Sequence, residues 1–262
     1  VEVEKMAARP AETLAERLAA RVDDRTACVL VSSVLFETAE IVPNLRVVAE
    51  ACERHGASLV VDAYHHLNVI PFDVHAMGLS TAFVTGGGYK YCQLGEGNGF
   101  LRLPPGSALR PVYTGWFSEF GELSRTPRKG EVVYGEGAAR FAGATYDPTA
   151  HYRAEAVFAF FDAQELTPAR LREINQRQVR LLRDAIEALD LDPSVARIES
   201  MPDDRRGGFL AVRTPRAAAL VRALRSRGVW TDSRGDVLRL GPAPYLRDEQ
   251  LRDGVQALAE SL

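Results

Sequence analysis

A carboxylate and a lysine each follow one of two short apolar segments that succeed one another in the chain. Residues 58–61 lead into Asp62, and residues 81–84 lead through three glycines to Lys90. Short apolar runs that stop at such residues are typical of buried strands in a parallel sheet. Because open α/β sheets carry their chemistry at the carboxyl ends of the strands, we expect Asp62 and Lys90 at one edge of a sheet.

Asp62 and Lys90 have complementary chemistry. A lysine in a desolvated pocket loses its proton readily and can form a Schiff base with an aldehyde. A buried aspartate can hold a pyridine nitrogen in its protonated form, which makes the ring an electron sink. The pair predicts a pyridoxal phosphate enzyme in which Lys90 carries the cofactor and moves protons at the substrate carbon. Taken singly, Lys90 could be a surface lysine and Asp62 a helix N-cap.

Further motifs occur in a consistent order. With them the chain resembles the class V aminotransferase group of fold-type I pyridoxal phosphate enzymes, and within it most of all kynureninase. The resemblance covers nearly the whole chain. Its motifs are Asp62-x-x-His65, Tyr89-Lys90-Tyr91, Gly115-Trp116-Phe117, residues 140–148, Asp232-Ser233-Arg234 and residues 238–245. The resemblance implies hydrolysis of a Cβ–Cγ bond in an amino acid, with a class V aminotransferase or a lyase as the alternative.

The resemblance also implies roles for five residues beyond Asp62. Lys90 would be the Schiff-base lysine, His65 would lie near the cofactor ring, and Tyr89 would bind the cofactor phosphate. Trp116 would contact the cofactor or the substrate. Thr145 would reach the phosphate bound by the neighbouring subunit of a homodimer with shared active sites.

Arg239 is the candidate for binding the substrate carboxylate. It stands between Leu238 and Leu240 in a strand-like segment, so alternation points it away from them. A guanidinium suits bidentate binding of a carboxylate, and the arginine at this place in the family does that work. A surface arginine is the simpler alternative, and Arg234 is a second candidate.

Three departures from the family pattern concern the substrate and the phosphate. Phe117-Ser118-Glu119 replaces a longer aromatic stretch that contains histidine, and Asp147-Pro148 replaces Asn-Pro. An acid in place of an amide loses a donor and adds charge, which can change the substrate. Residues 143–145 read Gly-Ala-Thr in place of Gly-Thr.

The hydrophobic pattern predicts an α/β fold. Strand, helix and strand signals alternate over the first half, which favours right-handed crossovers and a mainly parallel sheet. We expect residues 1–150 to form an incomplete large domain like that of pyridoxal phosphate transferases. Residues 151–262 should form connecting helices and a smaller C-terminal α+β domain. Strands are expected at 27–34, 58–62, 81–85, 99–103, 208–213 and 237–240, with a further strand-like segment at 1–4; helices are expected at 10–22, 44–54, 151–161, 168–189, 215–227 and 248–258.

Composition excludes several classes of protein. The 262 residues carry a net charge of −3 with mixed signs, so neither nucleic acid nor an anionic membrane is an expected partner. No apolar run is long enough to span a bilayer, and a cytoplasmic location is the default. Cys28 and Cys52 are expected to be packing residues, and no metal site is expected because His65 and His66 lack a third ligand at suitable spacing.

The start of the chain bears on activity. It begins with Val1 and contains neither a phosphate-binding glycine loop nor an aromatic residue ahead of the first helix that would stack on the cofactor. We therefore expect a sequence truncated at its N-terminus. An inactive fragment or a non-catalytic binding module is the alternative from another functional class.

Overall fold

A four-stranded sheet organises the first part of the molecule. The computed structural model describes residues 1–126, 128–143 and 145–262. The strands lie in the order β1-β2-β3-β4; the first three are parallel and β4 is antiparallel to β3. Their bounds are β1 Cys28–Ser32, β2 Ser58–Asp62, β3 Phe83–Gly87 and β4 Gly99–Arg102. This arrangement confirms the mainly parallel α/β sheet expected from the sequence.

The register aligns the chemistry at one edge. Ser32 pairs with Asp62, and Asp62 pairs with Thr85. The carboxyl ends of β1, β2 and β3 therefore coincide, and Lys90 follows β3 by three residues.

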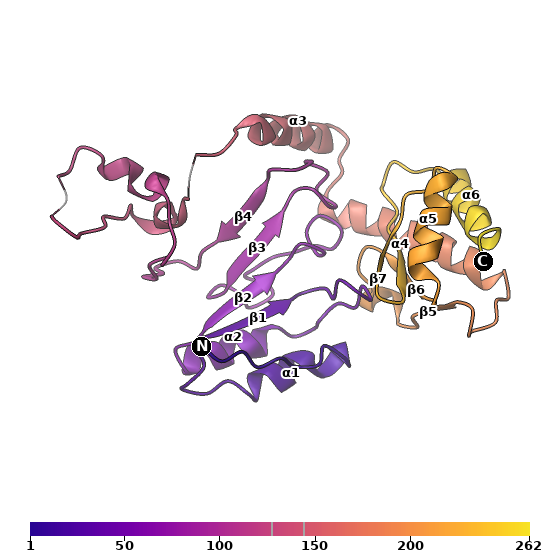
Figure 1. Cartoon of the computed structure of the whole chain (residues 1–262), viewed down its shortest axis with the longest axis horizontal. Helices are drawn as coiled ribbons and strands as arrows, with labels where there is room; N and C mark the ends of the chain where they lie inside the picture. The colour runs from indigo at the N-terminus through magenta and orange to yellow at the C-terminus, as the bar shows by residue number, and fades with distance from the viewer. Residues whose placement is uncertain (127, 144) are drawn as a thin grey trace.

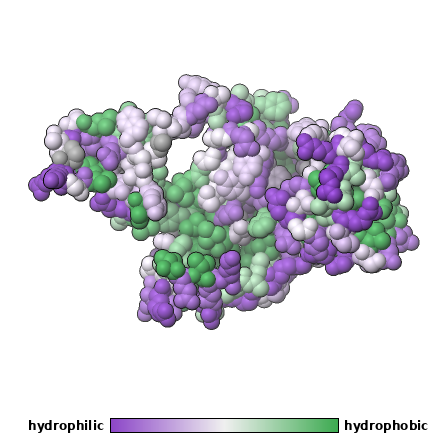
Figure 2. Space-filling view, viewed as in Figure 1, coloured by the Kyte–Doolittle hydropathy of each residue, from purple (hydrophilic) through white to green (hydrophobic). Residues whose placement is uncertain are grey.

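Two helices cover one face of this sheet. A 3-10 turn, η1 (Ala11–Thr13), leads into α1 (Leu14–Ala19), and α2 (Arg46–Arg54) connects β1 to β2. Their apolar residues and those of the strands form one core. The other face is largely bare, with Leu30 71% and Leu101 42% exposed. The centre of Figure 2 shows hydrophobic surface where Figure 1 shows this sheet.

An arm extends beyond β4. Residues 105–148 contain two 3-10 segments, η2 (Trp116–Glu122) and η3 (Gly137–Phe141), and lead into α3 (Thr149–Ala163). Figure 1 shows the arm reaching away from the C-terminal sheet. Apart from these short helical turns, the described part of the arm is irregular.

A second sheet with its own helices forms the C-terminal part. The strand order is β5-β6-β8-β7 and every pair is antiparallel. Helix α4 begins at Pro168 after Thr167, whose hydroxyl accepts a hydrogen bond from the backbone N–H of Arg170. The elements are α4 Pro168–Glu187, β5 Arg197–Ile198, η4 Asp203–Arg205, β6 Leu210–Arg213, α5 Ala217–Ser226, β7 Asp232–Arg234, β8 Val237–Leu240 and α6 Asp248–Ala259.

The two sheets have separate hydrophobic cores. The buried residues of the first core end at Val84, and those of the second begin at Val179. A small third cluster joins Ala39 to Phe209, Ala211 and Val237. We propose the division into 1–150 and 151–262 on this separation; the boundary falls in the first turn of α3, and α4 packs in the core of the smaller domain.

Three local expectations were wrong. Residues 1–4 form no strand, since no neighbouring strand pairs with them in the described part. Strands β5 and β7 were missed because they have two and three residues. Cys28 is exposed rather than packed, because it points to the same bare face as Leu30.

Within the described ranges, no helix combines the length and apolar character that crossing a membrane requires.

Candidate active site

The Asp62 carboxylate is held at the end of β2 by two neighbours. Its Oδ1 accepts a hydrogen bond from the backbone N–H of Tyr64 at 2.9 Å, and its Oδ2 accepts one from Ser32 Oγ at 3.0 Å. Asp62 therefore caps the turn that follows, as its simpler interpretation implied. A carboxylate has about four lone-pair positions, so both oxygens can still accept a further donor.

Lys90 and His65 form a close polar pair. Lys90 Nζ lies 2.7 Å from His65 Nε2. Burial, and then the charge of Lys90, lower the pKa of His65 to about 3, so the imidazole is neutral. When Lys90 is protonated it can only donate, and His65 then accepts at Nε2 and carries its proton on Nδ1. In the part of the chain described, that buried Nδ1 has no hydrogen-bond partner.

The environment of Lys90 makes its ammonium easier to deprotonate than that of an exposed lysine. Burial lowers its pKa, and this effect outweighs the opposing charge of Asp62. Its ammonium lies 5.6 Å from the centroid of each of two rings, Tyr64 and Tyr89. Among the described residues, no carboxylate forms a salt bridge with it. A lysine of this kind is a stronger nucleophile at neutral pH than an exposed one.

Packing explains the glycines that precede Lys90. A Cβ at Gly87 would lie 2.5 Å from the Tyr64 ring, and one at Gly88 would lie 2.6 Å from Leu94. A Cβ at Gly86 would come within 2.5 Å of Leu67. The absence of side chains lets the segment pass close to the turn after β2, which brings Lys90 to His65.

A second group of residues reaches this site from the C-terminal sheet. The Phe209 ring lies 5.6 Å from the His65 ring, edge to face, and the Arg239 guanidinium lies 5.3 Å from the centroid of Phe209. Arg239 is buried and forms an ion pair with Asp232. The charges of Arg239 and Asp232 both act on the pKa of Lys90. Sequence reasoning assigned no role to Ser32, Phe209 or Asp232, although the strand register alone would have placed Ser32 beside Asp62.

The remaining candidates lie in three different places. Tyr89 is adjacent to Lys90 and 48% exposed. Trp116 is 51% exposed and packs on Phe117 and Phe120 of the arm, outside the Lys90 group. Thr145 is exposed at the end of the arm, and its neighbour Ala144 lies outside the described residues.

His66 has a structural environment, as expected. It is 3% exposed, and its Nδ1 and Nε2 contact Ser33 Oγ and the carbonyl oxygen of Pro71. Burial lowers the pKa of His66 to about 4, so it packs as a neutral ring against Phe72.

The residues present fit pyridoxal phosphate. Asp62 has acceptor capacity for a pyridine N–H, Lys90 offers an amine with a lowered pKa, and the buried Nδ1 of His65 has no partner in the described part. These are the donor, acceptor and nucleophile that the cofactor requires.

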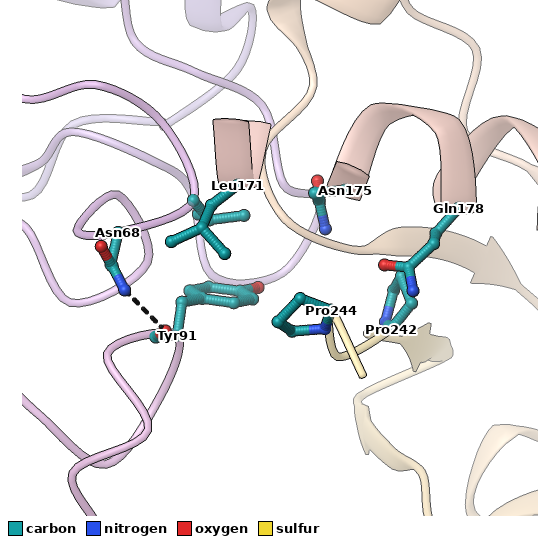
Figure 3. A pocket seen from close by; sticks show the side chains of 8 residues that line it. Asn68, Tyr91, Leu171, Asn175, Gln178, Pro242 and Pro244 are labelled. Carbon is teal, nitrogen blue, oxygen red and sulfur yellow. Dashed lines mark hydrogen bonds between the residues drawn. The ribbon is translucent and has the colours of Figure 1, made fainter. Parts of the chain in front are cut away.

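A cavity beside Tyr91, the residue that follows Lys90, is too small to hold a cofactor. It has a volume of about 20 Å³, is lined by Tyr91, Leu171, Asn175, Gln178 and neighbours, and is shown in Figure 3. Such a volume holds about one water molecule. Asp62, His65 and Lys90 are each half-buried and do not line this cavity.

Comparison with solved structures identifies the fold. The chain superposes on a cysteine desulfurase from Thermococcus onnurineus NA1 with a TM-score of 0.77 and 12% identity, covering 99% of this chain and 65% of the other. A cystine C-S lyase, C-DES, gives 0.72 and 19% identity, with 94% and 64% covered. The fold is therefore that of these pyridoxal phosphate transferase-like proteins.

The sequence relatives are more specific. A family model for the kynureninase C-terminal domain matches residues 171–258. A kynureninase of Bacillus thuringiensis subsp. konkukian is 29% identical over 97% of this chain, and the uncharacterized aminotransferase YcbU of Bacillus subtilis is 24% identical over 93%. The chain spans 59% of that kynureninase and 62% of YcbU. These matches confirm the resemblance to kynureninase and the class V group, and they support pyridoxal phosphate as the cofactor.

Proposed function

We propose that this chain belongs to a pyridoxal phosphate-dependent enzyme that acts on an amino acid, and that its reaction is a kynureninase-like hydrolysis. The observation that carries the proposal is the Lys90 amine, 2.7 Å from neutral His65, beside the strand end that presents Asp62. The similarity to kynureninases over 97% of the chain supports the choice of reaction.

Each residue has a role that follows from its chemistry. Lys90 would bind the aldehyde carbon of the cofactor and, once released, would move protons at the substrate carbon. Asp62 would keep the pyridine nitrogen protonated, and Tyr89 would donate to the phosphate. When bound, the cofactor supplies an electron sink for negative charge on the substrate. Neutral His65 would accept a hydrogen bond at Nε2 without adding a positive charge beside Lys90.

The substrate carboxylate would be bound by Arg239. Its guanidinium comes from β8 and is linked to His65 through the ring of Phe209. The smaller domain would thus bind the amino acid while the larger one binds the cofactor.

Product identification tests the reaction. We expect the cofactor-loaded protein to convert L-kynurenine and water into anthranilate and L-alanine in equal amounts, measured by chromatography with mass detection. The Lys90→Ala variant is the control for conversion without the enzyme. Formation of the 2-oxo acid of kynurenine would contradict hydrolysis and support transamination.

An aminotransferase is the second candidate function. Similarity to YcbU favours it, as do Phe117-Ser118-Glu119 and Asp147, where the family pattern of kynureninase is not kept. Amino transfer to a 2-oxo acid acceptor, measured with L-kynurenine as the donor, distinguishes this candidate from the first.

We further propose a two-fold homodimer in which the arm packs on the partner subunit. The arm exposes large apolar side chains, among them Tyr113 at 94%, Trp116 at 51% and Phe120 at 54%. Such a surface is typical of an interface. In this assembly Thr145 would reach the phosphate of the cofactor bound by the other subunit.

We expect Thr145→Ala to weaken cofactor binding by about 1–3 kcal/mol, the value of a lost hydrogen bond to a charged group. The measurement is the dissociation constant of the cofactor, with the exposed Thr149→Ala as control. Analytical ultracentrifugation that finds a catalytically active monomer would exclude the shared site.

A further inference from the structure

Asp232 and Arg239 face each other across two neighbouring strands. They are directly paired in the register of β7 and β8. Arg239 Nε donates to Asp232 Oδ1 at 2.7 Å, and Nη2 donates to Oδ2. This side-on, bidentate contact fixes the plane of the guanidinium as well as its position.

Two further contacts complete the surroundings of Arg239. Its Nη1 donates to the carbonyl oxygen of Phe36 at 2.6 Å, and one face lies over the ring of Phe209. The Arg239 side chain is 8% exposed, whereas that of Asp232 is 50% exposed. The arginine is thus enclosed by a carboxylate, a carbonyl and an aromatic ring.

Arg239 retains N–H groups that these contacts do not use. A guanidinium has five N–H groups, one on Nε and two on each terminal nitrogen. Asp232 takes the Nε–H and one from Nη2, and Phe36 takes one from Nη1. One N–H therefore remains on each terminal nitrogen. Such a pair matches the two oxygens of a carboxylate that approaches end-on.

We propose that Asp232 is the positioning residue that holds Arg239 so that its two terminal nitrogens bind the carboxylate of the amino acid end-on. This inference rests on the proposed function, in which Arg239 binds that carboxylate. Without Asp232, the long arginine side chain would lose the partner that fixes its plane. Asp232 itself does not touch the substrate in this arrangement.

The chain provides a matched control for Asp232. Asp236 lies in the turn that joins β7 to β8, forms an ion pair with Arg213, and has a side chain 51% exposed. Asp232→Asn and Asp236→Asn therefore make the same change of charge at the same exposure. Only Asp232→Asn removes the carboxylate that holds Arg239.

The first measurement does not depend on activity. In nitrogen-15 NMR spectra of the protein, we expect the Arg239 Nε–H to exchange slowly with water, because Asp232 accepts its hydrogen bond. The signal is assigned by its loss in Arg239→Lys. Asp232→Asn should accelerate that exchange at least about tenfold, as expected for a lost charge-assisted bond, while Asp236→Asn should not.

The second measurement uses a ligand with and without the carboxylate. Asp232→Asn should raise the KM for L-kynurenine about tenfold with little change in kcat, since uniform binding is lost. The affinity for kynuramine, which lacks the carboxylate, should not change. Asp232→Glu, which keeps the charge, should recover part of the loss.

The outcomes separate the inference from the proposed function. Unchanged or tighter binding of L-kynurenine in Asp232→Asn would overturn the positioning role, and so would fast exchange of the Arg239 Nε–H in the unmodified protein. If the unmodified protein does not bind L-kynurenine, the proposed function fails, and the exchange measurement alone decides whether Asp232 holds Arg239.

Discussion

Replacement of Lys90 by alanine is expected to abolish covalent attachment of pyridoxal phosphate and to lower turnover by at least about 10²–10⁴-fold, the contribution of one acid–base group. The physical reason is the environment of the amine. Burial lowers the pKa of Lys90, and its Nζ lies 2.7 Å from the neutral imidazole of His65. Alanine leaves no nucleophile at this position.

The measurement locates the cofactor directly. Borohydride reduction of the cofactor-loaded protein, followed by peptide mass analysis, should find the pyridoxyl mass on Lys90. The other two lysines of the chain, Lys5 and Lys129, are exposed and serve as internal controls. The Lys129→Ala variant should be labelled and active like the unmodified protein. Labelling of Lys5 or Lys129 instead would end the assignment.

The sheet, and the edge of it that carries Asp62, were predictable because they depend on local sequence patterns. An apolar run that stops at Asp62 and another that leads into glycines describe two buried strands, and β2 has the expected bounds. Once the strands are parallel, their register brings Ser32, Asp62 and Thr85 into line. The meeting of Lys90 with the turn after β2 follows from this topology.

Contacts between the two sheets were not predictable in the same way. Phe209 reads as an ordinary apolar residue of the strand expected at 208–213, yet it lies between His65 and Arg239. Gly208 precedes it, and a Cβ there would lie 2.4 Å from the Tyr91 ring. Nothing near Gly208 in the sequence indicates this requirement, because the tyrosine comes from the turn after β3.

The role of Asp232 was hidden for a related reason. Asp232-Ser233-Arg234 was visible as a motif, but its partner depends on the pairing of β7 with β8, and β7 has only three residues. A strand this short leaves no periodic pattern to detect. Arg239 was therefore interpreted as a single cation, whereas the structure presents it as half of a pair.

Replacement of Asp62 by asparagine is expected to leave the fold intact while turnover falls by about 10²–10³-fold, the usual effect of removing one electrostatic stabiliser. The amide oxygen can still accept from the Tyr64 N–H and the amide nitrogen can donate to Ser32 Oγ, so little stability should be lost. What the amide lacks is the charge that holds a pyridine nitrogen protonated.

Asp73 provides a control that distinguishes cofactor binding by Asp62 from capping of a turn. Asp73 also accepts, through Oδ1, from the backbone N–H two residues ahead, at 2.8 Å to His75, and it lies at the surface. If Asp62 only caps its turn, Asp62→Asn and Asp73→Asn should have equal, small effects on both unfolding and turnover. If Asp62 holds the cofactor, only Asp62→Asn should lower kcat and shift the absorbance band of the bound cofactor. A rate close to that of the unmodified protein in Asp62→Asn would reduce Asp62 to a cap.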